Sequence, residues 1–153
     1  MNNNDLLRYS RQIMLPELDV AGQQRLANAK VLVVGLGGLG SPLALYLASS
    51  GVGELVLVDD DHVDESNLQR QIAHTEASIG TNKAESAAAR IHEINTSTKL
   101  TSIKRRLDRS ELSGLLETVD LAFDATDNLA SRHLLNETCW NLGVPLVSGA
   151  ALQ

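Results

Sequence analysis

The sequence predicts an α/β fold in which a mostly parallel sheet carries helices on both faces and follows an N-terminal helical segment. Short β-branched runs such as KVLVVG (30–35) alternate with helical patterns such as NKAESAAARIHEIN (82–95), as is typical of parallel strands joined by crossover helices. The chain has 153 residues, of which 43% are hydrophobic and 21% charged, so its composition fits one globular domain.

Local patterns along the chain predict the individual elements. We expect strands at 30–35, 54–59, 99–107, 120–126 and 145–151. We expect helices at 41–50, 82–95, 111–119 and 128–143. Asp108 and Glu111 have the spacing of a capping box before the third of these helices, and Gly143 is a typical residue for ending the fourth.

The segment before the first strand has helical patterns on either side of Pro16 and no strand of its own. We therefore divide the chain into an N-terminal helical segment, 1–29, and an α/β domain, 30–153. Without a strand to join the sheet, the segment is expected to pack on the outside of the core or to reach toward a second subunit.

Three glycines after the first strand, Gly35, Gly37 and Gly40, form the pattern G-x-G-x-x-G. Between a strand and a helix, the first glycine allows a tight turn, the second lets the backbone approach a phosphate, and the third lets helix and strand pack closely. A phosphate then lies at a helix N-terminus, where free N–H groups favour an anion. Asp59 follows about 20 residues later, where such domains bind a ribose. The α/β domain is therefore predicted to be Rossmann-like and to bind a nucleotide.

The polar stretch ESNLQRQ (65–71) narrows the class of nucleotide. A dehydrogenase needs an apolar slot for a nicotinamide ring, whereas nucleotidyl transfer from a triphosphate requires cations around the departing pyrophosphate. Arg70 and Lys83 can supply these cations, so the residues favour ATP. The alternatives are an NAD-binding oxidoreductase and a nucleotide-binding module without catalysis.

DATDN (124–128) places Asp127 and Asn128 just after the fourth strand, at the edge of the sheet where open α/β folds bind ligands. Asp127 can hold a Mg²⁺ ion that bridges phosphate oxygens. Aspartate is also among the best helix N-caps. Its position alone leaves both interpretations of Asp127 open.

Several motifs, taken in order, resemble one family. RYSRQI (8–13), the stretch from VLVVGLGGLG to NLQRQ (31–71), Lys83 and DATDN (124–128) are similar to the ThiF/MoeB/HesA-type adenylyltransferases, the bacterial relatives of ubiquitin-activating enzymes. The resemblance implies that ATP and Mg²⁺ adenylate the C-terminal glycine of a small ubiquitin-like sulfur-carrier protein that ends in Gly-Gly, with release of pyrophosphate. It also implies a homodimer.

The resemblance further implies roles for individual residues. The implied catalytic residues are Arg11, Arg70, Lys83 and Asp127. The implied nucleotide-binding residues are Gly35, Gly37, Gly38, Gly40, Asp59, Asp61, Ser66, Asn67, Leu68, Gln69, Arg70, Lys83, Asp127 and Asn128. Asp127 is the expected Mg²⁺ ligand, and Arg11 is expected to enter the ATP site of the partner subunit.

Members of the family continue for many tens of residues beyond the stretch matched here, so the chain is expected to be shortened at its C-terminus. Many members hold a structural zinc with two CxxC pairs, whereas this chain has one cysteine, Cys139, and no zinc is expected in it. PLVSGAA (145–151) resembles the molybdopterin-synthase branch of the family more than the thiamine branch, and the ATP motifs are common to both.

Charge and composition exclude other classes. A formal charge of −6 and a pI near 5.1 argue against a nucleic-acid partner. The chain starts without a secretory signal and lacks an apolar stretch of the roughly 18–20 residues that span a membrane, so a cytoplasmic location is expected. The run Lys104-Arg105-Arg106 is interpreted as a solvated strand end, and Cys139 as a packing residue. Residues without ligand spacing, interpreted as surface or packing residues, are His62, His74, His92 and His133.

Overall fold

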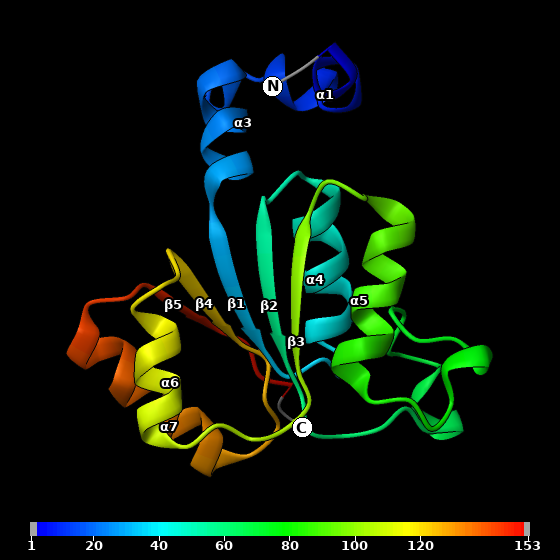
Figure 1. The fold of residues 1–153 in the computed structure, drawn as a ribbon, viewed down its shortest axis with the longest axis vertical. Helices are drawn as coiled ribbons and strands as arrows, with labels where there is room; N and C mark the ends of the chain where they lie inside the picture. Colours follow the sequence, from blue (N-terminus) through cyan, green and yellow to red (C-terminus); the bar gives the residue numbers. More distant parts are fainter. Residues whose placement is uncertain (1–2, 152–153) are drawn as a thin grey trace.

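The computed structural model describes residues 3–151 and confirms the predicted α/β architecture (Figure 1). The ends of the two predicted segments, residues 1–2 and 152–153, lie outside the described residues. The strands are β1 (Lys30–Val34), β2 (Glu54–Val58), β3 (Lys99–Ile103), β4 (Leu121–Asp124) and β5 (Leu146–Ser148). They pair in parallel in the order β3-β2-β1-β4-β5, so the direction of winding reverses between β1 and β4.

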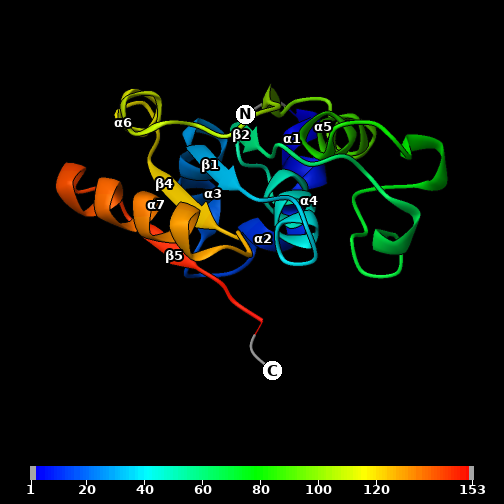
Figure 2. The same ribbon diagram turned by 90° about the horizontal axis from the view of Figure 1, so that it is seen from below.

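Helices cover both faces of the sheet. The helices are α4 (Gly40–Ser49), α5 (Lys83–Ile94), α6 (Arg109–Leu116) and α7 (Leu129–Leu142). The first two lie on one face and the last two on the other (Figures 1 and 2). None of the helices within residues 3–151 has the length and the apolar character that crossing a membrane requires.

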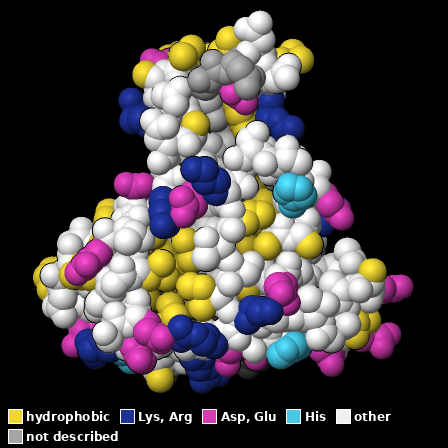
Figure 3. All heavy atoms as spheres, viewed as in Figure 1, with side chains coloured by type: hydrophobic (Ala, Val, Ile, Leu, Met, Phe, Trp, Pro, Cys, Tyr) yellow, Lys and Arg dark blue, Asp and Glu magenta, His cyan; other side chains and the backbone are white. Residues whose placement is uncertain are grey.

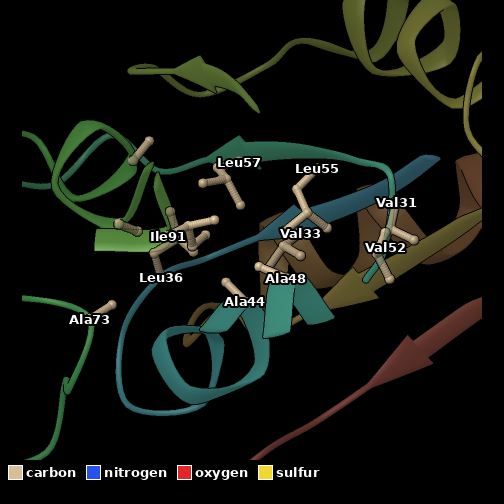
Figure 4. Packing of buried hydrophobic residues seen from close by; sticks show 12 residues of the cluster. Val31, Val33, Leu36, Ala44, Ala48, Val52, Leu55, Leu57, Ala73 and Ile91 are labelled. Atoms are coloured by element: carbon tan, nitrogen blue, oxygen red, sulfur yellow. The ribbon is translucent and has the colours of Figure 1, made fainter. Parts of the chain in front are cut away.

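The core has two parts, one on each face of the sheet, because successive side chains of a strand point in opposite directions. Figure 4 shows Val33 of β1 and Leu57 of β2 packed on the side of Ala44 in α4. Leu32, the neighbour of Val33, packs on the opposite face with Cys139 of α7. Cys139 is 2% exposed, which confirms it as a packing residue, and burial raises the pKa of its thiol.

Several element ends differ from the prediction. The strand expected at 99–107 ends at Ile103, and the strand expected at 145–151 ends at Ser148. The strand expected at 120–126 is limited to β4, and the helix expected at 111–119 is shifted to α6. The predicted capping box is present, because the Asp108 carboxylate accepts from the Glu111 N–H at 2.9 Å and Glu111 accepts in return at 3.0 Å.

The N-terminal segment forms three short helices, α1 (Asn3–Arg8), α2 (Ser10–Ile13) and α3 (Asp19–Asn28). The hydroxyl of Tyr9 accepts a hydrogen bond from Asn95 Nδ2 at 2.9 Å. Gln23 is fully buried and donates to the carbonyl of Ser50 at 2.9 Å. Asn95 and Ser50 precede β3 and β2, so these contacts fix the segment to the end of the sheet where the strands begin (Figure 1).

Between β2 and α5 the chain makes a long excursion, residues 60–82, which protrudes from the body at the lower right of Figure 1. It contains two single 3-10 turns, η1 (Glu65–Asn67) and η2 (Glu76–Ser78). Its two ends are held together, because the N–H of Val63 donates to the carbonyl of Thr81 at 2.8 Å and the N–H of Gly80 donates to Val63 at 2.9 Å.

Candidate nucleotide-binding site

A cleft of about 740 Å³ opens at the carboxyl ends of the strands, the edge from which the molecule is seen in Figure 2. Open α/β sheets bind ligands at this edge, next to the point where the winding reverses, which is here between β1 and β4. The volume lies in the range of small-molecule and cofactor sites. The predicted site residues that line the cleft are Gly35, Gly37, Gly38, Asp59, Asp61, Arg70, Lys83, Asp127 and Asn128.

The glycine loop has no room for side chains at two of its positions. Gly35 has φ +90°, and a Cβ there would stand 2.7 Å from the carbonyl oxygen of Ala125. A Cβ on Gly40 would stand 1.8 Å from the carbonyl oxygen of Gly35, so this glycine allows the close packing expected of it. α4 begins at Gly40 without a side-chain cap, and in its first turn the N–H of Ser41 donates to the carbonyl of Gly37 at 2.9 Å while Pro42 has no N–H. The positive end of the helix dipole still favours an anion at this position.

The carboxylate of Asp59 is tied to the glycine loop. Its Oδ2 accepts from the N–H of Leu36 at 2.7 Å, and its Oδ1 accepts from the N–H of Asp61 at 2.8 Å. Burial raises the pKa of Asp59, and the two backbone hydrogen bonds and Lys83 oppose this effect. Each oxygen keeps a further lone pair, so Asp59 can accept from ribose hydroxyls while it holds the loop.

Lys83 is held at the start of α5, with 8% of its side chain exposed and its Nζ 3.1 Å from Asp61 Oδ2. Asn82 fixes this arrangement, because its Nδ2 donates to the carbonyls of Asp59 and Asp61, each at 3.0 Å. Its Oδ1 accepts from the N–H of Ala84 at 2.9 Å and caps α5. The end of β2 and the first turn of α5 therefore form one unit in the cleft wall.

The turn that contains ESNLQRQ contributes its last two residues to the cleft. Arg70 and Gln71 line the cleft, whereas residues 66–69 lie outside its lining. The stem carbons of Arg70 lie 3.8 Å from the point where a Cβ on Gly38 would stand, so Arg70 passes close to the glycine loop. Leu68 is half-buried, as an anchor of the turn would be. The nucleotide-binding roles of Ser66, Asn67, Leu68 and Gln69 stay predictions.

β4 ends in a buried carboxylate. Oδ1 of Asp124 accepts from the hydroxyl of Thr126 at 2.6 Å, and its Oδ2 accepts from the hydroxyl of Ser148 at 2.7 Å. The Nε of Arg132 lies 3.3 Å from the same Oδ2. Nη2 of Arg132 donates to the carbonyls of Thr126 and Gly149, both at 2.8 Å. Arg132 thereby joins the loop after β4 to the chain after β5.

The structure excludes one of the two interpretations of Asp127. The cap of α7 is Asn128, whose Oδ1 accepts from the N–H of Ser131 at 2.9 Å. The capping interpretation of Asp127 is therefore wrong. Asp127 is exposed and lines the cleft, so its carboxylate is available to a metal ion. Its role as a Mg²⁺ ligand stays a prediction.

The three acidic residues after β2 also lie close together, with carboxylate oxygens of Asp59, Asp60 and Asp61 within 4.8 Å of one another. Their charges are offset by the protein itself, because Lys83 pairs with Asp61 and Arg106 Nε lies 2.9 Å from Asp60 Oδ2. Asp59 holds the glycine loop. Asp127 is thus better suited than these three residues to hold a metal ion.

Part of the cleft wall consists of residues that were not predicted from the sequence. The basic run after β3 is more than a solvated strand end, because Arg105 and Arg106 are exposed residues that line the cleft. In Figure 3, Lys and Arg side chains gather along the lower edge of the face, the edge at which the strands end in Figure 1. Their position directly after a strand could have predicted this placement, because the cleft lies at the carboxyl ends of the strands. The cleft wall also contains apolar residues against which the base of a nucleotide can pack: Val34, Leu107, Leu112, Leu129, Leu134 and Leu135.

Two other residues have clear places. His74 is buried, with Nδ1 2.9 Å from the Ser86 hydroxyl and Nε2 3.1 Å from the Leu36 carbonyl, so it packs behind the glycine loop as a structural residue. Burial lowers the pKa of His74. Arg11 is exposed on α2, at the opposite end of the sheet from the cleft (Figure 1). Its role in a partner subunit stays a prediction.

The fold and the site together define a class of protein, a Rossmann-like nucleotide-binding domain with cationic side chains, among them Arg70 and Lys83, and an available carboxylate in the cleft of its glycine loop. Comparison with known proteins then identifies the family. The profile of the ThiF family matches residues 9–153, and the chain belongs to this family.

Relatives in sequence are named as adenylyltransferases. The chain is 48% identical over 153 residues to the adenylyltransferase and sulfurtransferase MOCS3 of Aedes aegypti and 49% identical to the protein of that name from Mus musculus. The matches cover the whole chain but 35% and 33% of those proteins, so the chain spans about a third of their length.

Solved structures share the fold. Escherichia coli TcdA, a tRNA N6-threonylcarbamoyladenosine dehydratase solved in complex with ATP, matches with a TM-score of 0.91 and 30% identity over 99% of this chain and 63% of TcdA. E. coli MccB, solved with ATP, matches with a TM-score of 0.86 and 27% identity over 100% of this chain and 46% of MccB. These complexes support ATP as the ligand of the cleft.

Proposed function

We propose that this chain carries the adenylation site of an enzyme that transfers AMP from ATP to the C-terminal glycine of a small ubiquitin-like sulfur-carrier protein ending in Gly-Gly. The observation that carries the proposal is the presence of Arg70, Lys83 and the uncapped carboxylate of Asp127 in the cleft of the glycine loop. An NAD-dependent oxidoreductase needs none of these three groups. The names of the MOCS3 relatives point to the same activity.

The chemistry suits these residues. An oxygen of the carrier's terminal carboxylate attacks the α-phosphorus of ATP, the bond from that phosphorus to the bridging oxygen breaks, and pyrophosphate leaves with the electron pair. An α-carboxyl group has a pKa of about 3.3–3.7, so the nucleophile is already ionised at neutral pH and needs no general base. Arg70 and Lys83 reduce the repulsion between nucleophile and triphosphate, while Asp59 and the glycine loop hold the nucleotide in place.

Asp127 is the residue that would hold Mg²⁺ in this site. The carboxylate is exposed, lines the cleft and is not used as a helix cap, and carboxylate oxygens are the ligands that Mg²⁺ prefers. The ion would neutralise charge on the phosphate oxygens when bound.

The proposal includes a homodimer in which the N-terminal segment contacts the partner and Arg11 enters the partner's ATP site. Leu7 and Met14, on either side of Arg11, are 78% and 75% exposed, and such apolar exposure is typical of a surface that another subunit covers. Arg11 belongs to α2, on the N-terminal segment, and is not among the residues that line the cleft of its own chain, as expected of a residue that acts on a partner's site.

The molybdopterin pathway is part of the proposal, because the relatives at 48–49% identity are MOCS3 proteins. We also propose a cytoplasmic location. The thiamine pathway is the alternative, and exchange assays with the two carrier proteins distinguish the pathways.

The test is ATP–pyrophosphate exchange with Mg²⁺, measured with and without a carrier protein ending in Gly-Gly, and with NAD as a control ligand. Exchange that depends on the carrier is expected. Arg70→Ala should lower exchange by orders of magnitude, because it removes a cation beside the reacting phosphates. Arg90→Ala, which removes an exposed arginine paired with Glu93 on α5, is the matched control. Normal exchange in the Arg70 variant, or preference for NAD over ATP, would reject the proposal.

Mixing two inactive variants tests the dimer. Arg11→Ala and Arg70→Ala protomers should each lack exchange, and a mixture should regain it, because a mixed dimer contains one site with both arginines. No recovery after confirmed subunit exchange would reject the role of Arg11 in the partner.

A further inference from the structure

The motif RYSRQI (8–13) contains two side chains on either side of Arg11, those of Tyr9 and Gln12, to which the proposed function gives no role. Tyr9 is 5% exposed and Gln12 is half-buried. The guanidinium of Arg11, in contrast, is exposed and forms no hydrogen bond or ion pair with residues 3–151. A free cation therefore lies between two neighbours that face the body of the protein.

Gln12 binds the turn after α4. Its Nε2 donates to the carbonyl of Ser50 at 3.1 Å and to Oε1 of Gln23 at 3.0 Å. Gln23, which is fully buried on α3, donates to the same carbonyl at 2.9 Å. The two glutamines therefore join α2 and α3 to a single carbonyl group.

Tyr9 binds the residue that follows α5. Its hydroxyl accepts from Nδ2 of Asn95 at 2.9 Å, and the same Nδ2 donates to the carbonyl of Ala48 in α4 at 2.8 Å. Gly51 makes room for the tyrosine ring. It has φ +93°, and a Cβ there would stand 2.7 Å from Cζ of Tyr9 and 2.6 Å from Nε2 of Gln23. A side chain at position 51 would therefore push the N-terminal segment away from the body.

These contacts lie at the carboxyl ends of two helices whose amino ends lie at the nucleotide cleft. α4 begins at Gly40 of the glycine loop, and α5 begins at Lys83, which lines the cleft. With 10 and 12 residues, the two helices are about 15–18 Å long at a rise of about 1.5 Å per residue. A hydrogen-bonded helix of this length is stiff. The backbone of Arg11 is therefore held in a fixed position relative to the glycine loop of its own chain.

We propose that Tyr9 and Gln12 are positioning residues, which fix α2 so that the free guanidinium of Arg11 reaches the ATP site of the partner subunit in one orientation. The inference rests on the proposed function, because it takes Arg11 to act in the partner's site. In a symmetric dimer, contacts that fix α2 on one protomer place the arginine in the other protomer's site. A misplacement of about 1 Å can lower a rate by about 100-fold, so residues remote from the nucleotide can control exchange.

Two substitutions loosen α2. Gln12→Met keeps the length of the side chain and removes both of its hydrogen bonds. Tyr9→Phe keeps the ring and removes only the oxygen that accepts from Asn95. Gln24→Met is the matched control on α3, where Nε2 of Gln24 donates to Oδ1 of Asn28 in the same helix at 3.2 Å. Thermal unfolding establishes that each variant is folded at the temperature of the assay.

Carrier-dependent ATP–pyrophosphate exchange should fall about tenfold or more in Gln12→Met, because α2 is no longer held to the turn after α4. The fall should be smaller in Tyr9→Phe, which keeps the contacts of Gln12. Exchange in Gln24→Met should equal that of wild type.

Mixed dimers show in which subunit the residue acts. A mixture of Gln12→Met and Arg70→Ala should regain exchange, because the one site that keeps Arg70 receives Arg11 from the protomer with an intact Gln12. Random pairing makes about half of the dimers mixed, each with one complete site, so the rate should approach about a quarter of wild type. A mixture of Gln12→Met and Arg11→Ala should stay low, because the remaining Arg11 lies on a loosened α2. Tyr9→Phe is tested in the same two mixtures.

The opposite pattern, recovery with Arg11→Ala and none with Arg70→Ala, would overturn the inference, because Gln12 would then act on the site of its own chain. Equal exchange in both mixtures would also overturn it, as the result of a role in stability alone, and so would wild-type exchange in Gln12→Met and Tyr9→Phe. Failure of the Arg11→Ala and Arg70→Ala mixture to recover would instead reject the proposed role of Arg11, so the two failures are distinguishable.

Discussion

Replacing Arg132 by methionine tests how the loop after β4 is held in the cleft. The substitution removes two hydrogen bonds of 2.8 Å to the carbonyls of Thr126 and Gly149. It also leaves the carboxylate of Asp124, whose side chain is 0% exposed, without the cation at 3.3 Å. Methionine keeps the apolar stem of the side chain, so the change acts mainly on these polar contacts.

The size of the effect follows from these contacts. Hydrogen bonds from charged donors contribute about 1.5–3 kcal/mol each, and removing one partner of a buried ion pair costs about 3–5 kcal/mol. Arg132 is 25% exposed and Asp124 keeps its hydrogen bonds to Thr126 and Ser148, so water and these bonds offset part of the loss. We expect a loss of about 3 kcal/mol in the free energy of unfolding, within the total of about 5–15 kcal/mol for a protein domain.

Urea and thermal unfolding provide the assay. A loss of about 3 kcal/mol corresponds to a fall of about 6–12 °C in the melting temperature for a chain of this size. Asp124→Asn removes the buried charge, so the double variant should be more stable than the sum of the two single effects predicts, by about 1 kcal/mol or more. An Arg132→Met protein within about 1 kcal/mol of wild type, or strictly additive effects, would refute the reasoning.

Three further predictions concern the glycine loop and its surroundings. Gly40→Ala should destabilise the fold by about 1–3 kcal/mol, because its Cβ would stand 1.8 Å from the carbonyl oxygen of Gly35. Gly38→Ala, the control, should lower the free energy of unfolding by about 0.5 kcal/mol or less. Thermal unfolding measures both variants, and equal losses of stability would contradict the prediction. Because burial lowers the pKa of His74, the unfolded chain takes up the proton more readily, and stability should fall as the pH drops below about 6.5. Urea unfolding at about pH 7.5 and about pH 5.5 should show a smaller change for His74→Asn than for wild type, and an equal change would exclude this source. Asn128→Ala should lower the free energy of unfolding by about 1 kcal/mol, because it removes the N-cap of α7, and it should weaken ATP binding. Equilibrium unfolding measures the first effect and ATP titration the second. Unchanged stability would show that the Asn128 cap does not stabilise α7.

The sequence predicted the glycine loop and the α/β architecture because both depend on local patterns. It overestimated β3 because the alternating pattern continues to residue 107, whereas a strand also needs a neighbour. β2 ends at Val58, whose partner in β3 is Ile103. Residues after Ile103 therefore have no residue of β2 to pair with, and β3 ends there. The same reason ends β5 at Ser148, the partner of Asp124 at the end of β4. Pairing across the sheet, which no local pattern contains, decides these ends.

The candidate site was predictable to the extent that its residues adjoin a motif. Asp59, Arg70 and Lys83 follow recognisable sequence features and do line the cleft. Arg132 is the fourth residue of α7, and its hydrogen bond to Gly149 joins segments 17 residues apart, so no local pattern predicts it. Whether Asp127 or Asn128 caps α7 depends on the residue at which the helix begins. A shift of one residue exchanges the two roles, and sequence patterns do not locate helix ends that closely.

The excursion between β2 and α5 divides into two halves with different freedom to change. The half nearer the body of the protein contains Arg70 and Gln71, which line the cleft, and His74, which packs behind the glycine loop. Inserting or deleting residues in this half would therefore displace side chains of the site. The outer half, around η2, is bonded largely to itself, through the hydrogen bonds between Thr75 and Ser78. Lengthening a surface loop adds little entropic cost once its ends are joined. Insertions or peptide tags placed at η2 should therefore leave the nucleotide cleft intact, and this tip is the natural place for a protein of this kind to acquire new sequence.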